Sequence, residues 1–162
     1  MPNSVSIDQG LEAIKQMIEN AIITNGEAGK KAVINSSQTI NILHEVVKSD
    51  LVSQGVNPAL IRPLLGTTSP EIQLAGFLKF KTQDVCVFPN HLQSIPETIY
   101  FNGLHTGKRD PYGELFSENV LTINLRSQLS SLAKNKDTMY ERTYAEPLNL
   151  HRRLPKMVLG EV

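Results

Sequence analysis

Residues 120–128 have the sequence VLTINLRSQ, and they decide the fold that we expect for this chain. The apolar, partly β-branched run over 120–125 predicts a strand. A helical pattern from 129 to 151 follows it, and residues 157–162 predict another strand. A helix between two such strands is typical of the crossover connection in a parallel sheet. The sequence therefore predicts a mixed α/β fold, in which helices flank a central sheet.

The segments before this region contain two helices. Apolar residues at helical spacing predict helices over 7–24 and 36–54. Ser6 and Gln9 have the spacing of a capping box, and Gly26 is a typical helix end. These helices define an N-terminal helical region.

The pattern changes again between the helices and residue 120. Residues 69–71 (Ser-Pro-Glu) have the order of an N-cap, a first-turn proline and an acid, which predicts a brief helix. Residues 76–88 alternate loosely and predict one bent strand or two strands joined by a hairpin. A short strand is expected over 99–101, and a loop over the Gly-rich, Pro-rich and charged residues 102–118.

We accordingly divide the chain into a helical region, 1–68, and an α/β core, 69–162. Gly160-Glu161-Val162 closes the sequence inside a predicted strand, so a C-terminally truncated core is one interpretation.

The composition excludes several classes of protein. The chain has 162 residues, of which 40% are hydrophobic, so it can bury a core and is too apolar for a disordered coil. No run approaches the roughly 20 apolar residues of a membrane span, and no signal peptide pattern is present. Cys86, the single cysteine, excludes a disulfide framework and a cysteine-built zinc site. We therefore expect a cytoplasmic protein.

Charge is balanced over the whole chain but not along it. There are 16 basic and 16 acidic side chains in total. Residues 126–156 carry seven basic and three acidic side chains, whereas residues 1–50 carry four basic and six acidic ones. A basic segment of this kind is either a phosphate-facing surface or simply a solvated helix face.

The common short catalytic motifs are absent from the sequence. It has no phosphate-binding loop, no dinucleotide-binding glycine pattern, no HExxH and no GxSxG. The four histidines are scattered, and Cys86 lies in an apolar run typical of a buried core residue.

One constellation of polar residues remains. Asp84 precedes an apolar run, and about forty residues later the predicted strand ends in Asn-Leu-Arg-Ser-Gln (124–128). The helix after it carries Asn135 and the block RTYAE (142–146). This order resembles the PD-(D/E)xK nuclease superfamily, particularly type II restriction endonucleases. Some of those enzymes have an E-x-K-S-Q strand end, an Asn-containing turn and an R-T-x-x-E block. The resemblance covers roughly residues 71–151.

The resemblance implies a site that hydrolyses DNA phosphodiester bonds with Mg²⁺, a cation that bridges the phosphate and the attacking water. In it, Asp84 is the first metal-binding acid, Asn124 occupies the second acid position and Arg126 the lysine position. Glu71 matches an upstream acid that serves as an additional ligand or orienting group. The residues that it implies near nucleic acid are Gln128, Lys134, Lys136 and Arg142.

Two departures from the family pattern leave alternatives open. Asn124 offers an amide oxygen without charge, and Arg126 is a permanent cation that cannot act as a base. The expected function is a sequence-specific double-stranded DNA endonuclease, working as a homodimer because two-fold symmetry suits a palindromic site. The alternatives are a catalytically degenerate DNA-binding or interaction protein on the same scaffold, and an α/β domain unrelated to nucleic acid.

Overall fold

A computed structural model of the protein describes residues 5–100, 106–126 and 132–162. Within 132–142 it describes the backbone and, of the side chains, those of Asp137 and Tyr140. The two long N-terminal helices are α1 (Ile7–Ile34) and α2 (Gln38–Ser53). Ser6 caps α1 through the expected capping box with Gln9. None of the helices in the described ranges has the length and hydropathy needed to span a bilayer.

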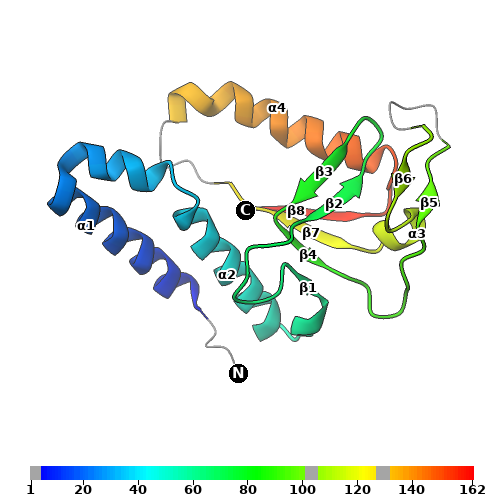
Figure 1. The fold of residues 1–162 in the computed structure, drawn as a ribbon, viewed down its shortest axis with the longest axis horizontal. Coiled ribbons are helices and arrows are strands. Elements are labelled where there is room, and N and C mark those ends of the chain that lie inside the picture. The colour runs from blue at the N-terminus through cyan, green and yellow to red at the C-terminus, as the bar shows by residue number, and fades with distance from the viewer. Residues whose placement is uncertain (1–4, 101–105, 127–131) are drawn as a thin grey trace.

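Helix α1 continues past the predicted end at Gly26. Gly26 has φ 60° and ψ −145°, a conformation that interrupts the helix and favours glycine. The residues after it resume the helix, and Figure 1 shows the two arms of α1 at an angle to each other. Gly26 therefore interrupts the helix as its sequence position suggests, but the prediction that the helix ends there was wrong.

The main sheet has four strands in the order β1-β4-β7-β8. Strand β4 is antiparallel to both of its neighbours, whereas β7 and β8 are parallel. Helix α4 (Leu132–His151) lies between β7 and β8 in the sequence, which confirms the predicted crossover and the mixed α/β class. Pro147 does not break this helix. The strands are β1 (Ile61–Arg62), β4 (Val85–Val87), β7 (Leu121–Asn124) and β8 (Val158–Glu161).

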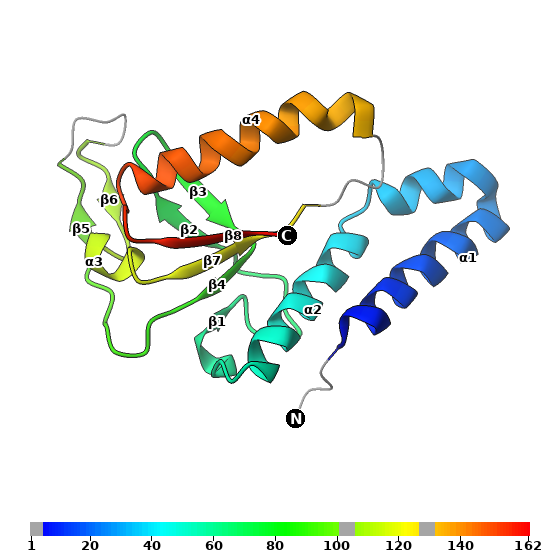
Figure 2. The ribbon, with the colours of Figure 1, turned by 180° about the vertical axis from the view of Figure 1, so that it is seen from behind.

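Each face of this sheet has its own core. Alternate residues of a strand point to opposite faces, so Val85 and Cys86 separate into the two cores. Val85 packs with Ile61, Leu125 and the apolar side of α2. Cys86 packs with Leu150 at the end of α4 and with other apolar residues of that side. Helices α2 and α4 consequently cover opposite faces, as Figures 1 and 2 show from the two sides.

A small hairpin lies against α4, and it replaces the brief helix expected over 69–71. Strands β2 (Ile72–Ala75) and β3 (Phe80–Gln83) pair antiparallel, and Glu71 directly precedes β2. The helix prediction was wrong because Ile72 and Leu74 alternate with polar residues and bury one side of the hairpin. The hairpin turn packs on Asn149 of α4, where a Cβ atom on Gly76 would come within 2.2 Å of its Nδ2.

The remaining elements are short. Pro58–Leu60 form a 3-10 helix, and Asn57 is its N-cap. The strand expected over 99–101 is instead β5 (Glu97–Thr98), which pairs with β6 (Arg109–Asp110). The expected loop thus contains β6 and also α3 (Glu114–Ser117), while residues 101–105 lie outside the described part of the chain. Single-sequence patterns rarely predict two-residue strands, because their pairing depends on distant partners.

Strand β1 lies within residues 1–68, yet it pairs with β4 of the main sheet. The N-terminal region therefore contributes both a covering helix, α2, and an edge strand to the same sheet.

Candidate functional site

Polar residues form a row across three neighbouring strands at one end of the main sheet. Asn124 at the end of β7 pairs in register with Glu161 of β8. On its other side, β7 pairs with β4 through Val85 and Ile123, and one further step in that register sets Asp84 beside Asn124. Asn124 and Glu161 lie on the face covered by α4, because Leu159 of β8 packs there. Asp84 lies in the bend directly before β4. We call Asp84, Asn124 and Glu161 the polar row.

Asp84 is held by the backbone of the neighbouring strand. It lies between β3 and β4, where the chain leaves the hairpin and enters the main sheet. Its Oδ2 accepts a hydrogen bond of 2.7 Å from the backbone N–H of Leu125. The side chain therefore extends the β4–β7 ladder by one bond and fixes one carboxylate oxygen next to Asn124.

Asn124 is buried and incompletely satisfied. Asn124 is 4% exposed, and its Nδ2 has no hydrogen-bond partner among the residues that the structure describes. Thr122 Oγ1 and Gln83 Oε1 are also buried without a partner within the described ranges. Buried polar atoms are normally hydrogen-bonded, so these atoms are available to bind a water or a ligand.

Arg126 joins the row to helix α4 through ion pairs. Its Nε lies 2.8 Å from Glu161 Oε2, and its Nη2 lies 2.7 Å from Glu146 Oε2. Glu146 also pairs with Lys81 of β3, with Nζ and Oε1 2.5 Å apart. We call Arg126, Glu146, Glu161 and Lys81 the Arg126 cluster. These pairs place two cations and two carboxylates around one end of the polar row.

The pKa values in this cluster favour the charged forms. Burial alone would raise the pKa of Glu146, but hydrogen bonds from Lys81 and Arg126 outweigh it and lower the pKa. Burial likewise acts to lower the pKa of Arg126, while its bonds to Glu161 and Glu146 raise it. At neutral pH both side chains are therefore ionised.

Glu71 lies near the row but on another strand pair. Ile72 pairs with Gln83, so Glu71 and Asp84 are the next residues along the two strands. Glu71 is exposed, and Asp84 and Glu71 both act electrostatically on His44 of α2. His44 is 5% exposed with an unpartnered Nε2 among the described residues, and burial is the main cause that lowers its pKa. The structure therefore brings Glu71 towards Asp84 from the side of α2.

The side chains of the residues implied near nucleic acid lie outside the described part of the structure. Gln128 lies outside the described residues. Lys134, Lys136 and Arg142 belong to α4, but their side chains lie outside the described part of the structure.

Three residues of the site were not among those expected from the sequence. Glu146 closes the RTYAE block quoted above, so its position was visible although its role was not. Lys81 and Glu161 are separated from Arg126 by 45 and 35 residues respectively, and only the pairing of strands and the packing of α4 bring them together. No local pattern marks such partners.

Metal binding at the row depends on hard oxygen donors. Asp84 and Glu161 supply carboxylates and Asn124 supplies an amide, which suits Mg²⁺ because that ion is usually held by one or two carboxylates and keeps several waters. The described residues contain no group of three or more His, Cys, Asp or Glu side chains arranged to hold a metal ion. A cation held here by Asp84 and Asn124 would therefore keep most of its water ligands.

Cys86 is a core residue and not a reactive thiol. Cys86 is fully buried in the α4-side core, and burial raises the pKa of its thiol. This confirms it as a core residue and leaves it protonated at neutral pH.

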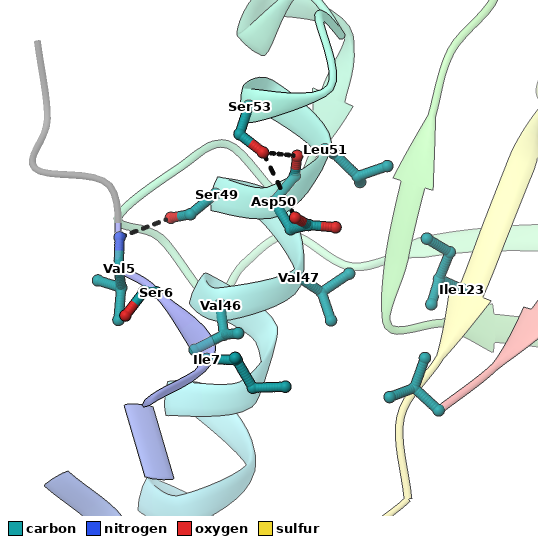
Figure 3. A pocket seen from close by; sticks show the side chains of 11 residues that line it. Val5, Ser6, Ile7, Val46, Val47, Ser49, Asp50, Leu51, Ser53 and Ile123 are labelled. Carbon is teal, nitrogen blue, oxygen red and sulfur yellow. Dashed lines mark hydrogen bonds between the residues drawn. The ribbon is translucent and has the colours of Figure 1, made fainter. Parts of the chain in front are cut away.

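A separate hollow lies between the start of α1, α2 and the end of β8 (Figure 3). It has a volume of about 590 Å³, and its walls are mostly apolar. Figure 3 shows Ile7, Val47 and Ile123 around it, while its polar residues are occupied locally, since Ser49 accepts a bond from Val5 and Ser53 bonds to Asp50. The hollow is on the α2 face, away from the polar row.

In comparisons with known proteins, the chain matches no family model, no curated protein and no solved structure.

Proposed function

We propose that the protein is a Mg²⁺-dependent, sequence-specific endonuclease of double-stranded DNA, similar to type II restriction enzymes. The observation that carries the proposal is the adjacency of Asp84, directly before β4, and Asn124, at the end of β7, with Arg126 two residues beyond that strand. These are the three positions that the sequence motif implied. The buried Asn124 Nδ2, which has no partner among the described residues, adds support because it can donate to an oxygen of a ligand such as a phosphate.

The sheet supports a restriction-endonuclease-like core. Asp84 comes at the start of one strand, Asn124 ends the next strand of the sheet, and α4 then crosses over to β8. The chain thus has the order of acid, second strand end and helix on which the resemblance was based. The implied partner is DNA, the implied state is a homodimer and the implied location is the cytoplasm.

The side chains of the row divide the work as follows. Asp84 and Asn124 offer oxygens to Mg²⁺, and the cation supplies Lewis-acid activation of the phosphate and of the attacking water. Arg126 contributes a fixed positive charge beside the scissile phosphate, where negative charge develops in the transition state. Because Arg126 is held by Glu146 and Glu161, its guanidinium is oriented before substrate binds.

Cleavage of DNA with a matched pair of variants tests this function. Phage and plasmid DNA of mixed sequence is incubated with the protein in Mg²⁺, Mn²⁺ or a chelator. Asp84→Asn keeps an oxygen to accept the Leu125 bond, so the fold is retained while one charge is lost. Asp50→Asn, on α2, is the same chemical change at an exposed position outside the row.

We expect discrete fragments from the wild-type protein and from Asp50→Asn, dependent on the metal. In Asp84→Asn the rate should fall by at least about 100-fold, since a metal ligand that carries charge is removed. Absence of cleavage by the wild-type protein with both metals would overturn the proposal.

A catalytically degenerate DNA-binding protein is the second candidate. It is favoured by the neutral side chain at Asn124 and by the two ion pairs that hold Arg126. It predicts DNA binding without cleavage, with an affinity that falls steeply as salt rises because phosphate contacts release counterions. Binding that is absent or insensitive to salt would contradict this candidate.

A further inference from the structure

Helix α1 leaves much of its apolar surface exposed. Of its 28 residues, all of which the structure describes, only three are buried. Figures 1 and 2 show α1 on the outer side of α2, which separates it from the sheet. Ile7 is 63% exposed, Leu11 53% and Ile22 41%, and Ile18 is partly exposed. Because a helix normally buries its apolar side, and exposed apolar patches mark interaction sites, this surface indicates a protein partner.

The exposed apolar residues of α1 form one continuous stripe. At 3.6 residues per turn they fall within about 60° around the helix axis. We call them the α1 stripe, which consists of Ile7, Leu11, Ile18 and Ile22. Along one border of the stripe α1 packs on α2, where a Cβ atom on Gly10 would come within 2.4 Å of Val46 Cγ2. The stripe itself is turned away from this tight contact.

The stripe begins at the hollow between α1, α2 and the end of the sheet. Ile7 lines this hollow from α1, and Val47 and Ile123 line it from α2 and β7 (Figure 3). Val162, which is 68% exposed, lines it at the end of β8. The volume of about 590 Å³ is well above the roughly 150 Å³ that encloses a benzene molecule. The hollow therefore has room for aliphatic side chains of a partner.

The spacing of the stripe is the same in both chain directions. Ile7 and Leu11 are four residues apart, and so are Ile18 and Ile22. Two copies aligned antiparallel therefore set Ile7 opposite Ile22 of the partner subunit, and Leu11 opposite Ile18 of the partner subunit. A two-fold symmetric interface requires self-complementarity of this kind. In this register Ile22 of the partner subunit lies at the hollow beside Ile7.

The charged residues along the other border of the stripe favour the antiparallel arrangement. In the register above, each of them lies level with an uncharged residue of the partner subunit. A parallel pairing would instead set each one level with its own copy, so that like charges repel. These residues are Asp8, Glu12, Lys15 and Glu19.

The size of the contact is sufficient for a stable dimer. The arm of α1 before Gly26 is about 28 Å long, with a diameter of about 10 Å. In a reciprocal contact each copy buries one side of this arm and also the groove that receives the arm of the other copy. Together these surfaces amount to on the order of 800 Å² per copy, which is the standard size of a specific interface.

We infer that the α1 stripe and the adjoining hollow bind the same surface of a second copy of this chain, in an antiparallel and two-fold symmetric contact. The inference assigns a surface to self-association and is independent of the chemistry of the polar row. Helices α1 and α2 of the two copies then form a four-helix arrangement on the side of the molecule away from α4.

Sedimentation velocity of the whole chain, over about 1–100 μM, tests this inference. Ile22→Lys should raise the Kd of the dimer at least about 30-fold, because it puts a charge into an apolar contact. Ile23→Lys is the matched control: it makes the same change at the next residue, which is 82% exposed and points away from the stripe, and it should leave the Kd within about twofold.

A second substitution tests the register. Ile7→Glu alone should also weaken the dimer. Ile7→Glu and Ile22→Lys in one chain set opposite charges across the contact, so the double variant should bind at least about tenfold more tightly than Ile22→Lys. Because both positions are exposed, each variant should keep the far-UV circular dichroism of the wild-type protein.

Three outcomes would overturn the inference. They are a wild-type chain that stays monomeric at about 100 μM, a Kd that Ile22→Lys changes no more than Ile23→Lys does, and a double variant that binds no more tightly than Ile22→Lys. DNA cleavage is measured separately on the same proteins. A dimer that depends on Ile22 but does not cleave DNA would overturn the proposed nuclease alone, whereas cleavage by a monomeric wild-type chain would overturn this inference alone.

Discussion

Two arginines of this protein each bridge two acids, but their surroundings differ. Arg153 pairs with Asp110 at 2.7 Å and with Glu97 at 2.9 Å, and its Nη1 donates to the carbonyl of Ala75. The side chains of Arg153 and Asp110 are 2% and 0% exposed. We call these three charged residues the Arg153 cluster. Glu97 is 42% exposed, so the enclosed part of this cluster is the Arg153–Asp110 pair. Arg126, by contrast, is 19% exposed and Glu161 is 26% exposed.

The difference separates a structural role from a candidate functional one. The Arg153 cluster ties the β5–β6 hairpin to strand β2 and to the residues that follow α4, which are all parts of the fold. The Arg126 cluster lies next to a buried amide without a partner and can be reached by solvent. The buried Arg153–Asp110 pair therefore links parts of the fold, whereas the partly exposed Arg126–Glu161 pair can be reached by a ligand.

The largest effect is expected from Arg153→Met. Removing the cation leaves Asp110 buried without its ion-pair partner, which costs about 3–5 kcal/mol of unfolding free energy. Denaturant unfolding at pH 7 measures it. Arg152→Met is the control, since the exposed Arg152 stacks over Phe77 with 4.7 Å from its guanidinium carbon to the ring centroid, and its loss should cost about 0.5–1 kcal/mol. Equal losses in the two variants would show that the Arg153 cluster is not the stronger support.

A smaller loss is expected from Arg126→Met. The cluster is partly exposed, and Glu146 retains Lys81 as a partner, so the unfolding free energy should fall by about 1 kcal/mol. The same denaturant experiment measures it. A loss as large as that of Arg153→Met would place the Arg126 cluster among the structural supports and remove the contrast between the two arginines.

The pH dependence of stability gives the smallest expected effect. The folded protein holds the pKa of Glu146 below its ordinary value of 4.5, so the unfolded chain takes up a proton first as pH falls. The contribution of Glu146 is therefore complete above about pH 5 and is lost as pH falls through the folded pKa. In Glu146→Gln the unfolding free energy should depend less on pH between about 5 and 3 than in the wild-type protein. Parallel curves for the two proteins would contradict the assignment.

The sequence predicted the parts of the fold that depend on long, regular patterns. Helix α2, strand β7 and the crossover through α4 to β8 follow from periodicity and strong β-propensity, and they are confirmed. Strand β2 was mistaken for a helix start, because Ser69-Pro70-Glu71 satisfies a capping pattern while the hairpin that overrides it forms with residues 80–83. At these residues the tertiary packing of the hairpin outweighs the local preference for a helix start.

The sequence predicted the site residues that belong to one motif order, but not the residues that reach the site by strand pairing or helix packing. Asp84, Asn124 and Arg126 come from a motif order, and the structure sets them on neighbouring strands. Glu161 depends on the register between β7 and β8, and Lys81 depends on how the β2–β3 hairpin packs against α4. Neither can be inferred from a single sequence, because strand register is set by the whole sheet.

The rate of plasmid cleavage as a function of Mg²⁺ concentration, compared between the wild-type protein and Asn124→Asp, tests whether the polar row is a metal-dependent hydrolytic site. Adding a carboxylate between Asp84 and Glu161 should lower the half-saturating Mg²⁺ concentration by at least about fivefold, while a chelator abolishes cleavage by both proteins. An unchanged half-saturating concentration, or cleavage that persists in the chelator, would contradict the assignment of hydrolysis to this row.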